Sequence, residues 1–166
     1  MESLAIWFAN TLGKYVSREV VIFIISMVPI LELRGGLLVG SLLDVSILKA
    51  APICVVGNII PIPFILLFIK QIFKWLKKIK WCRGIIEKLE NRAMGKSDSI
   101  KKYEFWGLVL FVGIPLPGTG AWTGSLIAAL LEIDFKKAIL AELLGIAIAT
   151  IIMSIFSYGL LGVLLG

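Results

Sequence analysis

Long apolar segments, interrupted only by short polar ones, run through almost the whole of this chain. Hydrophobic residues make up 59% of its 166 residues, against roughly 45–50% in soluble globular domains. The remaining residues are too few to cover a soluble globule, so the sequence predicts an integral membrane protein. A membrane-crossing helix needs ~20 apolar residues, which limits a chain of this length to a handful of such helices.

The residue types needed for most enzymatic and metal chemistry are scarce. The chain has no histidine, which excludes imidazole as a general base or metal ligand. Its two cysteines, Cys54 and Cys82, lack the spacing of a metal or redox motif. We therefore expect neither an enzyme nor a protein that carries a metal or an organic cofactor.

Positive charge is concentrated in residues 70–104, which hold eleven of the 17 lysines and arginines but four of the 11 acids. A basic stripe on a soluble domain would indicate nucleic-acid binding, but apolar segments flank this one, so nucleic acid is not an expected partner. The positive-inside rule places the segment in the cytoplasm, in a multi-pass protein of the plasma (inner) membrane. Residues 1–18 lack the features of a removable signal peptide.

The same segment has the pattern of an amphipathic helix. Its apolar residues recur at spacings of three and four: Ile72, Trp75, Ile79, Cys82, Ile86 and Leu89. Such a helix can lie in the lipid headgroup layer, where Trp75 and Trp81 would be well placed. A linker helix packed on the rest of the protein fits the pattern equally well.

The chain contains an internal repeat. Shifting the sequence by 88 residues aligns 19–68 with 107–156 without a gap. The eleven identical pairs include Phe23/Phe111, Pro29/Pro117, Gly36/Gly124 and Gly57/Gly145. Shared richness in leucine, isoleucine and glycine explains part of this identity, but not the aligned prolines, glycines and acids. Weak internal symmetry of this kind is typical of transporters built from two repeats.

Each repeat begins with an apolar run of about ten residues that ends in prolines and glycines. Ten helical residues rise ~15 Å, half of the hydrocarbon core. The residues expected to break the helices there are Pro29, Gly35, Gly36, Pro115, Pro117 and Gly118. A second short apolar run, an acidic turn and a long apolar helix follow in both repeats.

Two topologies agree with this pattern. If the broken element crosses the membrane, the repeats are parallel; if it enters and returns as a re-entrant hairpin, they are inverted. We favour an all-α membrane domain of two inverted repeats, about 19–69 and 105–160, joined by the basic cytoplasmic segment 70–104. The hairpin tips would meet near the midplane. Lys49 would then lie outside, against the positive-inside rule.

Two charged residues, Glu32 and Arg34, lie in the first Pro/Gly segment. A charged side chain at bilayer depth costs at least ~2.5–3.5 kcal/mol, so this pair needs an explanation. The two residues could pair with each other and hold the segment together. In the functional interpretation, Arg34 binds an anionic group, for which its planar fork suits phosphate, and Glu32 carries a proton.

The second Pro/Gly segment carries no charge. The Thr119 and Thr123 hydroxyls and the backbone amides around Gly118 and Gly120 offer a binding site for an anion. Trp122 would either stack on the ligand or seal the segment. No lysine follows the glycines as it does in a nucleotide-binding loop, so nucleotide binding is not expected.

Polar residues also stand in the long apolar helices. Glu142 is either an interfacial acid near the charges at 134–137 or a proton relay. Asn58 requires hydrogen-bond partners, and it could bond a neighbouring helix or line a substrate cavity. The C-terminal Gly162-x3-Gly166 offers a packing face for a homodimer.

At these residues the sequence resembles the small multidrug-export protein family. The resemblance rests on ELRGG (32–36), GNIIPIP (57–63) and PLPGTGAWTGSLIA (115–128) and covers nearly the whole chain. That family is similar to the DedA membrane proteins, which have two inverted repeats with re-entrant hairpins and are linked to proton-driven movement of lipid phosphates. The resemblance implies that Glu32 and Arg34 are the functional acid and base. The DedA pattern also has arginines in the second hairpin, where this sequence has none.

Three functions therefore fit the sequence. The first is a proton-coupled transporter that moves an amphiphilic or lipid-phosphate-like substrate between the two hairpins, surrounded by membrane lipids. The second is antiport of cationic amphiphiles against protons, with Glu32 as the substrate anchor. The third is a membrane protein that organises lipids or partners without transport.

Overall fold

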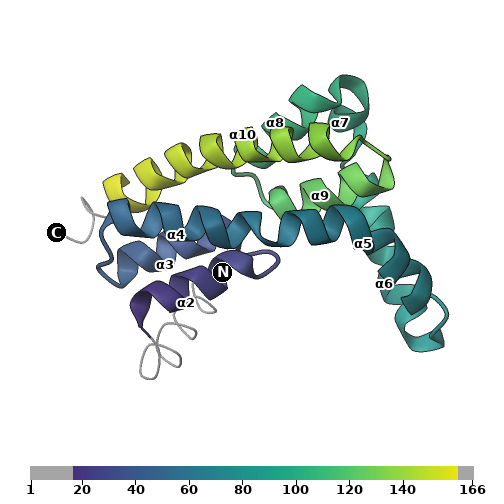
Figure 1. The fold of residues 1–166 in the computed structure, drawn as a ribbon, viewed down its shortest axis with the longest axis horizontal. Coiled ribbons are helices and arrows are strands. Elements are labelled where there is room, and N and C mark those ends of the chain that lie inside the picture. Colours follow the sequence, from purple (N-terminus) through teal and green to yellow (C-terminus); the bar gives the residue numbers. More distant parts are fainter. Residues whose placement is uncertain (1–16, 161–166) are drawn as a thin grey trace.

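The structure, a computed structural model, describes residues 17–160, and all regular secondary structure within them is helical (Figure 1). The helices are α2 (Arg18–Met27), α3 (Glu32–Leu42), α4 (Ile47–Ile59), α5 (Pro61–Leu76), α6 (Lys80–Met94), α7 (Asp98–Tyr103), α8 (Phe105–Gly113), α9 (Ala121–Leu130), α10 (Phe135–Ser154) and the π-helix η1 (Ile155–Leu160). The all-α prediction is confirmed for these residues. The expected absence of a signal peptide and the glycine face at 162–166 concern residues that are wholly or largely outside this range.

Two long apolar helices form the frame of the molecule. In the described part of the chain, Ile47–Leu76 (α4 with α5) and Phe135–Gly159 are long and apolar enough to cross a membrane. Pro61 opens α5 at its first position, where the missing amide donor costs little, so α5 continues directly from α4 through Ile60. Although α4 and α5 carry separate labels, the prolines at 61 and 63 do not interrupt the apolar span from Ile47 to Leu76.

The two long helices run in opposite directions (Figure 1). The Tyr158 hydroxyl, near the end of the second, donates to the Val45 carbonyl, which precedes the first, at 2.9 Å. At the other end of the molecule, the Lys70 ammonium of α5 lies 2.5 Å from the Glu132 carboxylate, just before α10. The end of each long helix therefore lies beside the start of the other.

Two short helical hairpins complete the frame. Hairpin 1 consists of α2 and α3, with ten and eleven residues, and hairpin 2 consists of α8 and α9, with nine and ten. Arg18 donates to the Leu43 carbonyl at 2.8 Å, so the open end of hairpin 1 lies next to the start of α4. Lys137 lies 2.9 Å from Glu104, so the open end of hairpin 2 lies next to the start of α10. Because the long helices are antiparallel, the hairpins open at opposite ends of the molecule.

The second half of each repeat has the same local structure. The α3–α4 and α9–α10 turns place Asp44 at φ 55° and Glu132 at φ 58°. The amide of Val45 donates to Gly40 at 2.9 Å, and that of Ile133 donates to the Ala128 carbonyl at 3.0 Å. All these positions are 88 residues apart. The two turns therefore have the same local geometry at the spacing of the predicted repeat.

The ungapped alignment is wrong in the first helix of each repeat. A Cβ at Gly57 would lie 2.8 Å from the Phe23 carbonyl oxygen, and one at Gly145 would lie 2.9 Å from the Val109 carbonyl oxygen. By packing, Phe23 therefore corresponds to Val109, 86 residues later, and not to Phe111. The α8–α9 turn is longer than the α2–α3 turn, and apolar helix residues are too interchangeable for an alignment to reveal the shift.

The basic segment does not form the single amphipathic helix that its spacing predicts. A turn at 77–79 separates α5 from α6, and α7 follows as a third helix. Of the predicted apolar stripe, Ile86 is buried, whereas Ile72, Trp75, Ile79 and Leu89 are exposed. Trp81 is 80% exposed. The segment therefore packs on the protein at a few positions and presents most of its apolar side chains outward.

The core consists of two clusters. One joins hairpin 1 to α4, with Ile22, Leu37 and Cys54 among its members. The other joins hairpin 2 to α5 and α10, with Ile62 and Ala121 among its members. The space between these clusters is where the turns of the two hairpins meet.

Candidate functional site

The start of α3, just after the turn of hairpin 1, contacts the turn of hairpin 2 and the start of α9. We call residues 28–31 turn 1 and residues 114–120 turn 2. The Glu32 carboxylate, at the start of α3, accepts hydrogen bonds from the backbone amides of Ala121 at 3.0 Å and of Trp122 at 2.9 Å. These amides are the first two of α9, where the helix dipole favours negative charge. Glu32 is 4% exposed, so it is a buried acid that caps a helix of the other repeat.

Local backbone geometry makes this approach possible. Glu32 itself has φ 50°, which turns the chain from turn 1 into α3. Gly120 precedes α9 with φ 136°, and the Glu32 carboxylate occupies the space that a Cβ would need there. Glycine is required at position 120 for both reasons, since an L side chain would be strained and would collide with the carboxylate.

Arg34 binds turn 2 from the same helix. Its guanidinium donates to the Leu116 carbonyl at 2.8 Å, the Thr119 hydroxyl at 3.1 Å and the Ile114 carbonyl at 3.2 Å. A longer contact of 3.5 Å joins it to the carbonyl of Val112, in the last turn of α8. The carbonyls of Val112 and Ile114 are at the C-terminus of α8, where carbonyls lack intrahelical donors and the dipole favours a cation.

The two charges of α3 therefore match the two ends of the other hairpin. Glu32 lies at the N-terminus of α9, and Arg34 lies at the C-terminus of α8. Among the described residues, the ion pairs within 4.0 Å do not include one between Glu32 and Arg34, so the expected internal pair is not formed. In the predicted anion site of the second Pro/Gly segment, the first two α9 amides are bonded to the Glu32 carboxylate.

Trp122 connects this contact to an apolar groove. Its indole nitrogen donates to the Met27 carbonyl at 3.0 Å, while its backbone amide donates to Glu32. Its side chain lines a groove of about 280 Å³. The other lining residues are all on α5: Pro61, Phe64, Ile65, Phe68, Ile69 and Ile72. We call this the α5 groove.

Glu142 is buried, not interfacial. It is fully shielded from solvent in α10, two helical turns after Phe135 begins the helix. Its two carboxylate oxygens lie 2.9 and 2.8 Å from the Ser125 hydroxyl of α9. The interfacial alternative is wrong because the open end of hairpin 2 covers the start of α10. Ser125 had no signal in the sequence, since a single serine in an apolar helix is common.

Two predicted site residues remain, Asn58 and Thr123. Asn58 is 2% exposed, and within residues 17–160 its side-chain oxygen has no hydrogen-bond partner. It lies on α4 between Cys54 of one core cluster and Ile62 of the other. Thr123 is half-buried in the first turn of α9. Neither has a contact that assigns it a role.

The prolines and glycines divide into two groups. Pro29 lies in turn 1, and Pro115, Pro117 and Gly118 lie in turn 2, so these residues stand where the helices end. Gly35 and Gly36 do not break a helix; both lie inside α3. Gly36 packs closely against Ser26 and Cys54, so its role is close helix packing.

Lys96 also contacts turn 2, which the sequence did not indicate. Its ammonium donates to the Gly118 carbonyl at 2.8 Å. It comes from the basic segment, between α6 and α7, so this segment touches the contact region as well as joining the repeats. No group of three or more cysteine, aspartate or glutamate side chains within 17–160 could hold a metal ion.

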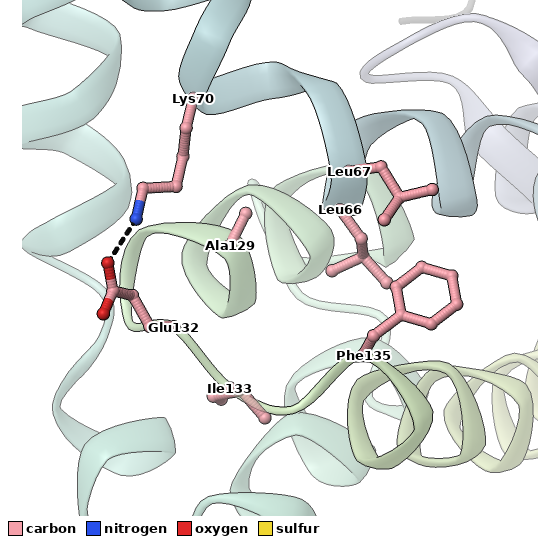
Figure 2. Close-up of a pocket in the computed structure, with 7 residues that line it drawn as sticks. All are labelled: Leu66, Leu67, Lys70, Ala129, Glu132, Ile133 and Phe135. Carbon is pink, nitrogen blue, oxygen red and sulfur yellow. Dashed lines mark hydrogen bonds and ion pairs between the residues drawn. The ribbon is translucent and has the colours of Figure 1, made fainter.

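A second hollow lies on the other side of α5 (Figure 2). It has a volume of about 230 Å³ and is lined by Leu66, Leu67, Lys70, Ala129, Glu132, Ile133 and Phe135. Figure 2 shows Lys70 reaching from α5 to Glu132 in the α9–α10 turn. The hydrogen bond from Lys70 lowers the pKa of Glu132. This exposed pair holds α5 to the start of α10 and lies apart from the two turns.

One comparison with known proteins gives a result. A family model described as "Putative small multi-drug export protein" matches residues 32–152. The match includes Glu32, Arg34, turn 2, α9 and most of both long helices. No curated protein and no solved structure matches the chain.

Proposed function

This chain belongs to the small multi-drug export protein family, and from that membership we propose that it is a proton-coupled membrane transporter of amphiphilic substrates. Its substrate site is the contact between the start of α3 and the start of α9. The observation that carries the proposal is the Glu32 carboxylate on the amides of Ala121 and Trp122. A buried acid that can gain or lose a proton there controls the bonding between the two repeats.

We propose that the repeats are inverted and that both hairpins are re-entrant. Two features of the fold support this arrangement: the antiparallel long helices, and hairpins that open at opposite ends. Arms of about ten residues reach ~15 Å, half of the hydrocarbon core. Irregular backbone at that depth must be covered by protein, and the two turns cover each other. Residues 70–104 then lie in the cytoplasm.

The coupling follows from competition for the α9 amides. While Glu32 is ionised, its two oxygens occupy the amides of Ala121 and Trp122. Protonation removes the charge that makes these bonds strong and leaves the amides available to an anionic group of the substrate. The substrate and the Glu32 carboxylate then exclude each other, so each proton taken up is linked to one substrate bound.

Glu142 provides a second carboxyl group on the same side of α9. Its burial makes the charged form costly, and Ser125 can exchange a hydrogen bond with either of its oxygens. We assign it the relay of protons towards Glu32. A Glu142→Gln variant is expected to bind substrate normally but to lose acceleration by a pH gradient.

Lipid-phosphate-like compounds are the substrate class that this competition favours, since they present an anion on an apolar chain. The alternative, cationic amphiphiles, is favoured by one observation. Arg34 is already bonded to three carbonyls and a hydroxyl, so it has little capacity left for a phosphate. In that case Glu32 itself would bind the cation and release its proton.

Reconstitution into lipid vesicles distinguishes these functions. With an imposed pH gradient, wild-type protein is expected to move a labelled alkyl phosphate, and Glu32→Gln is expected to abolish the dependence on the gradient. Glu87→Gln, in an exposed pair on α6, is the matched control. Movement of a cationic dye but not of the phosphate would favour the alternative. If wild-type protein moves neither the phosphate nor the dye, a non-transporting role is favoured.

A further inference from the structure

The α5 groove is an apolar channel with a defined length. Its residues on α5 are spaced by three and one, so they form a single face of the helix. From Pro61 to Ile72 the helix rises ~16 Å, which is about half of the hydrocarbon core. Nearly all of its lining is apolar. A groove of this shape fits one hydrocarbon chain lying along one leaflet.

The two ends of the groove differ. Ile62 and Ala121 belong to one buried cluster, so the Pro61 end lies beside the start of α9, where Trp122 and the Glu32 contact are found. Beyond Ile72, Trp75 in the last turn of α5 and Lys78 in the turn that follows it are both exposed. These residues open the segment that carries most of the cations of the chain.

We propose that the α5 groove binds the hydrocarbon chain of a single-chain anionic amphiphile from the cytoplasmic leaflet. Its head group lies at the Lys78 end, and the tip of its chain lies against Trp122. This inference rests on the proposed function and names the substrate class and its route of entry. The positive charge of the basic segment favours an anionic head group. Trp75 lies at the same end, and tryptophan is enriched at the membrane interface where that head group would lie.

Trp122 gives the groove access to the contact between the repeats. The same residue donates its backbone amide to Glu32 and its indole nitrogen to Met27 of hairpin 1. A chain that displaces the indole ring therefore acts directly on both bonds. Binding in the groove and opening of the turn contact become linked through one side chain.

Fluorescence quenching of Trp122 tests the location. Trp7, Trp75, Trp81 and Trp106 are replaced by phenylalanine in the full chain, which is placed in lipid nanodiscs. The probe is dodecyl phosphate brominated at its terminal carbons. Saturable quenching of Trp122 is expected, with much weaker quenching when the bromines are next to the head group. Equal quenching by both probes, or none that saturates, would overturn the proposal.

Two substitutions on neighbouring residues test the groove itself. Phe68 lines it, whereas Leu67 lines the hollow on the other side of α5. Both are about half exposed, so truncation should leave the fold intact. Phe68→Ala is expected to weaken binding of the terminally brominated phosphate about tenfold, and Leu67→Ala is expected to leave it unchanged. Equal effects of the two would overturn the proposal.

The head group is tested with Lys78→Gln. This variant is expected to weaken binding of the phosphate probe at least fivefold. Binding of dodecyltrimethylammonium brominated at the same carbons is expected to stay unchanged. Tighter binding of the ammonium probe to wild-type protein would overturn the anionic assignment. Binding is measured without a pH gradient, so intact quenching with no transport contradicts only the proposed function. Normal transport with no quenching contradicts only the groove.

Discussion

Replacement of Glu32 by glutamine should destabilise the protein, because it removes a charge that joins the two repeats. The carboxylate accepts from two amides, at 3.0 and 2.9 Å, in a site that is 4% exposed. The glutamine side chain has nearly the same shape, but it presents one oxygen and one NH₂ group. One of the amides of Ala121 and Trp122 would then face another donor.

The size of the effect follows from these contacts. A hydrogen bond to a charged group contributes about 1.5–3 kcal/mol, and a buried donor left without a partner costs about 1–3 kcal/mol. The lost interaction with the α9 N-terminus adds roughly 0.3–1 kcal/mol. Allowing for overlap among these contributions, we expect Glu32→Gln to lower the free energy of unfolding by about 2–4 kcal/mol. Glu32→Ala should cost more, because both amides lose their acceptor.

Thermal unfolding in detergent micelles, followed by circular dichroism, measures this difference. At about 2–4 °C per kcal/mol for a chain of this size, the Tm of Glu32→Gln should lie roughly 4–16 °C below that of wild type. Glu87→Gln, which changes an exposed acid, should leave the Tm unchanged. A Tm for Glu32→Gln that equals the wild-type value would show that the carboxylate does not hold the turns together.

Three further outcomes are expected. Arg34→Lys should lower the Tm, with a loss of about 1–3 kcal/mol, because an ammonium cannot reproduce the planar guanidinium that serves several acceptors of turn 2; an unchanged Tm would contradict this role. Gly120→Ala should prevent stable folding or lower the free energy of unfolding by more than ~3 kcal/mol, since its Cβ would meet the Glu32 carboxylate and its φ is 136°. Gly84 has open space around it, so Gly84→Ala should raise the free energy of unfolding by ~0.5–1 kcal/mol in the same melting assay. A cysteine introduced by Lys49→Cys, in a Cys82→Ser background that keeps the buried Cys54, should react with an impermeant maleimide added outside the cell; reaction only from the cytoplasm would exclude inverted repeats.

Local features of the sequence were enough to predict the elements and the turns that end them. Pro29 and Pro117 stand where helices end, because a residue without an amide donor and with a fixed φ disfavours the helix interior wherever it occurs. The acidic turns at Asp44 and Glu132 recur at the same spacing in sequence and in structure. Apolar length predicted two helices that can cross a membrane, since that property depends only on composition along one segment.

The sequence did not predict how the helices pack against one another. Apolar helices of valine, isoleucine and leucine can slide by two residues without a change in pattern, so the correspondence of Phe23 with Val109 appeared only when their carbonyls were found against Gly57 and Gly145. The pairing of Glu142 with Ser125 was hidden for the same reason. Gly35 and Gly36 were expected to break a helix, and the fold uses Gly36 for close packing instead.

The sequence by itself predicted a helical membrane protein of two similar halves, and it places an acid and an arginine in the first Pro/Gly segment. Only the tertiary structure decided what these two side chains bind. Their partners are backbone amides and carbonyls more than 75 residues away, and every residue type presents such groups. A side-chain pattern therefore cannot predict these backbone partners. They become available to Glu32 and Arg34 because α8 ends and α9 begins beside α3.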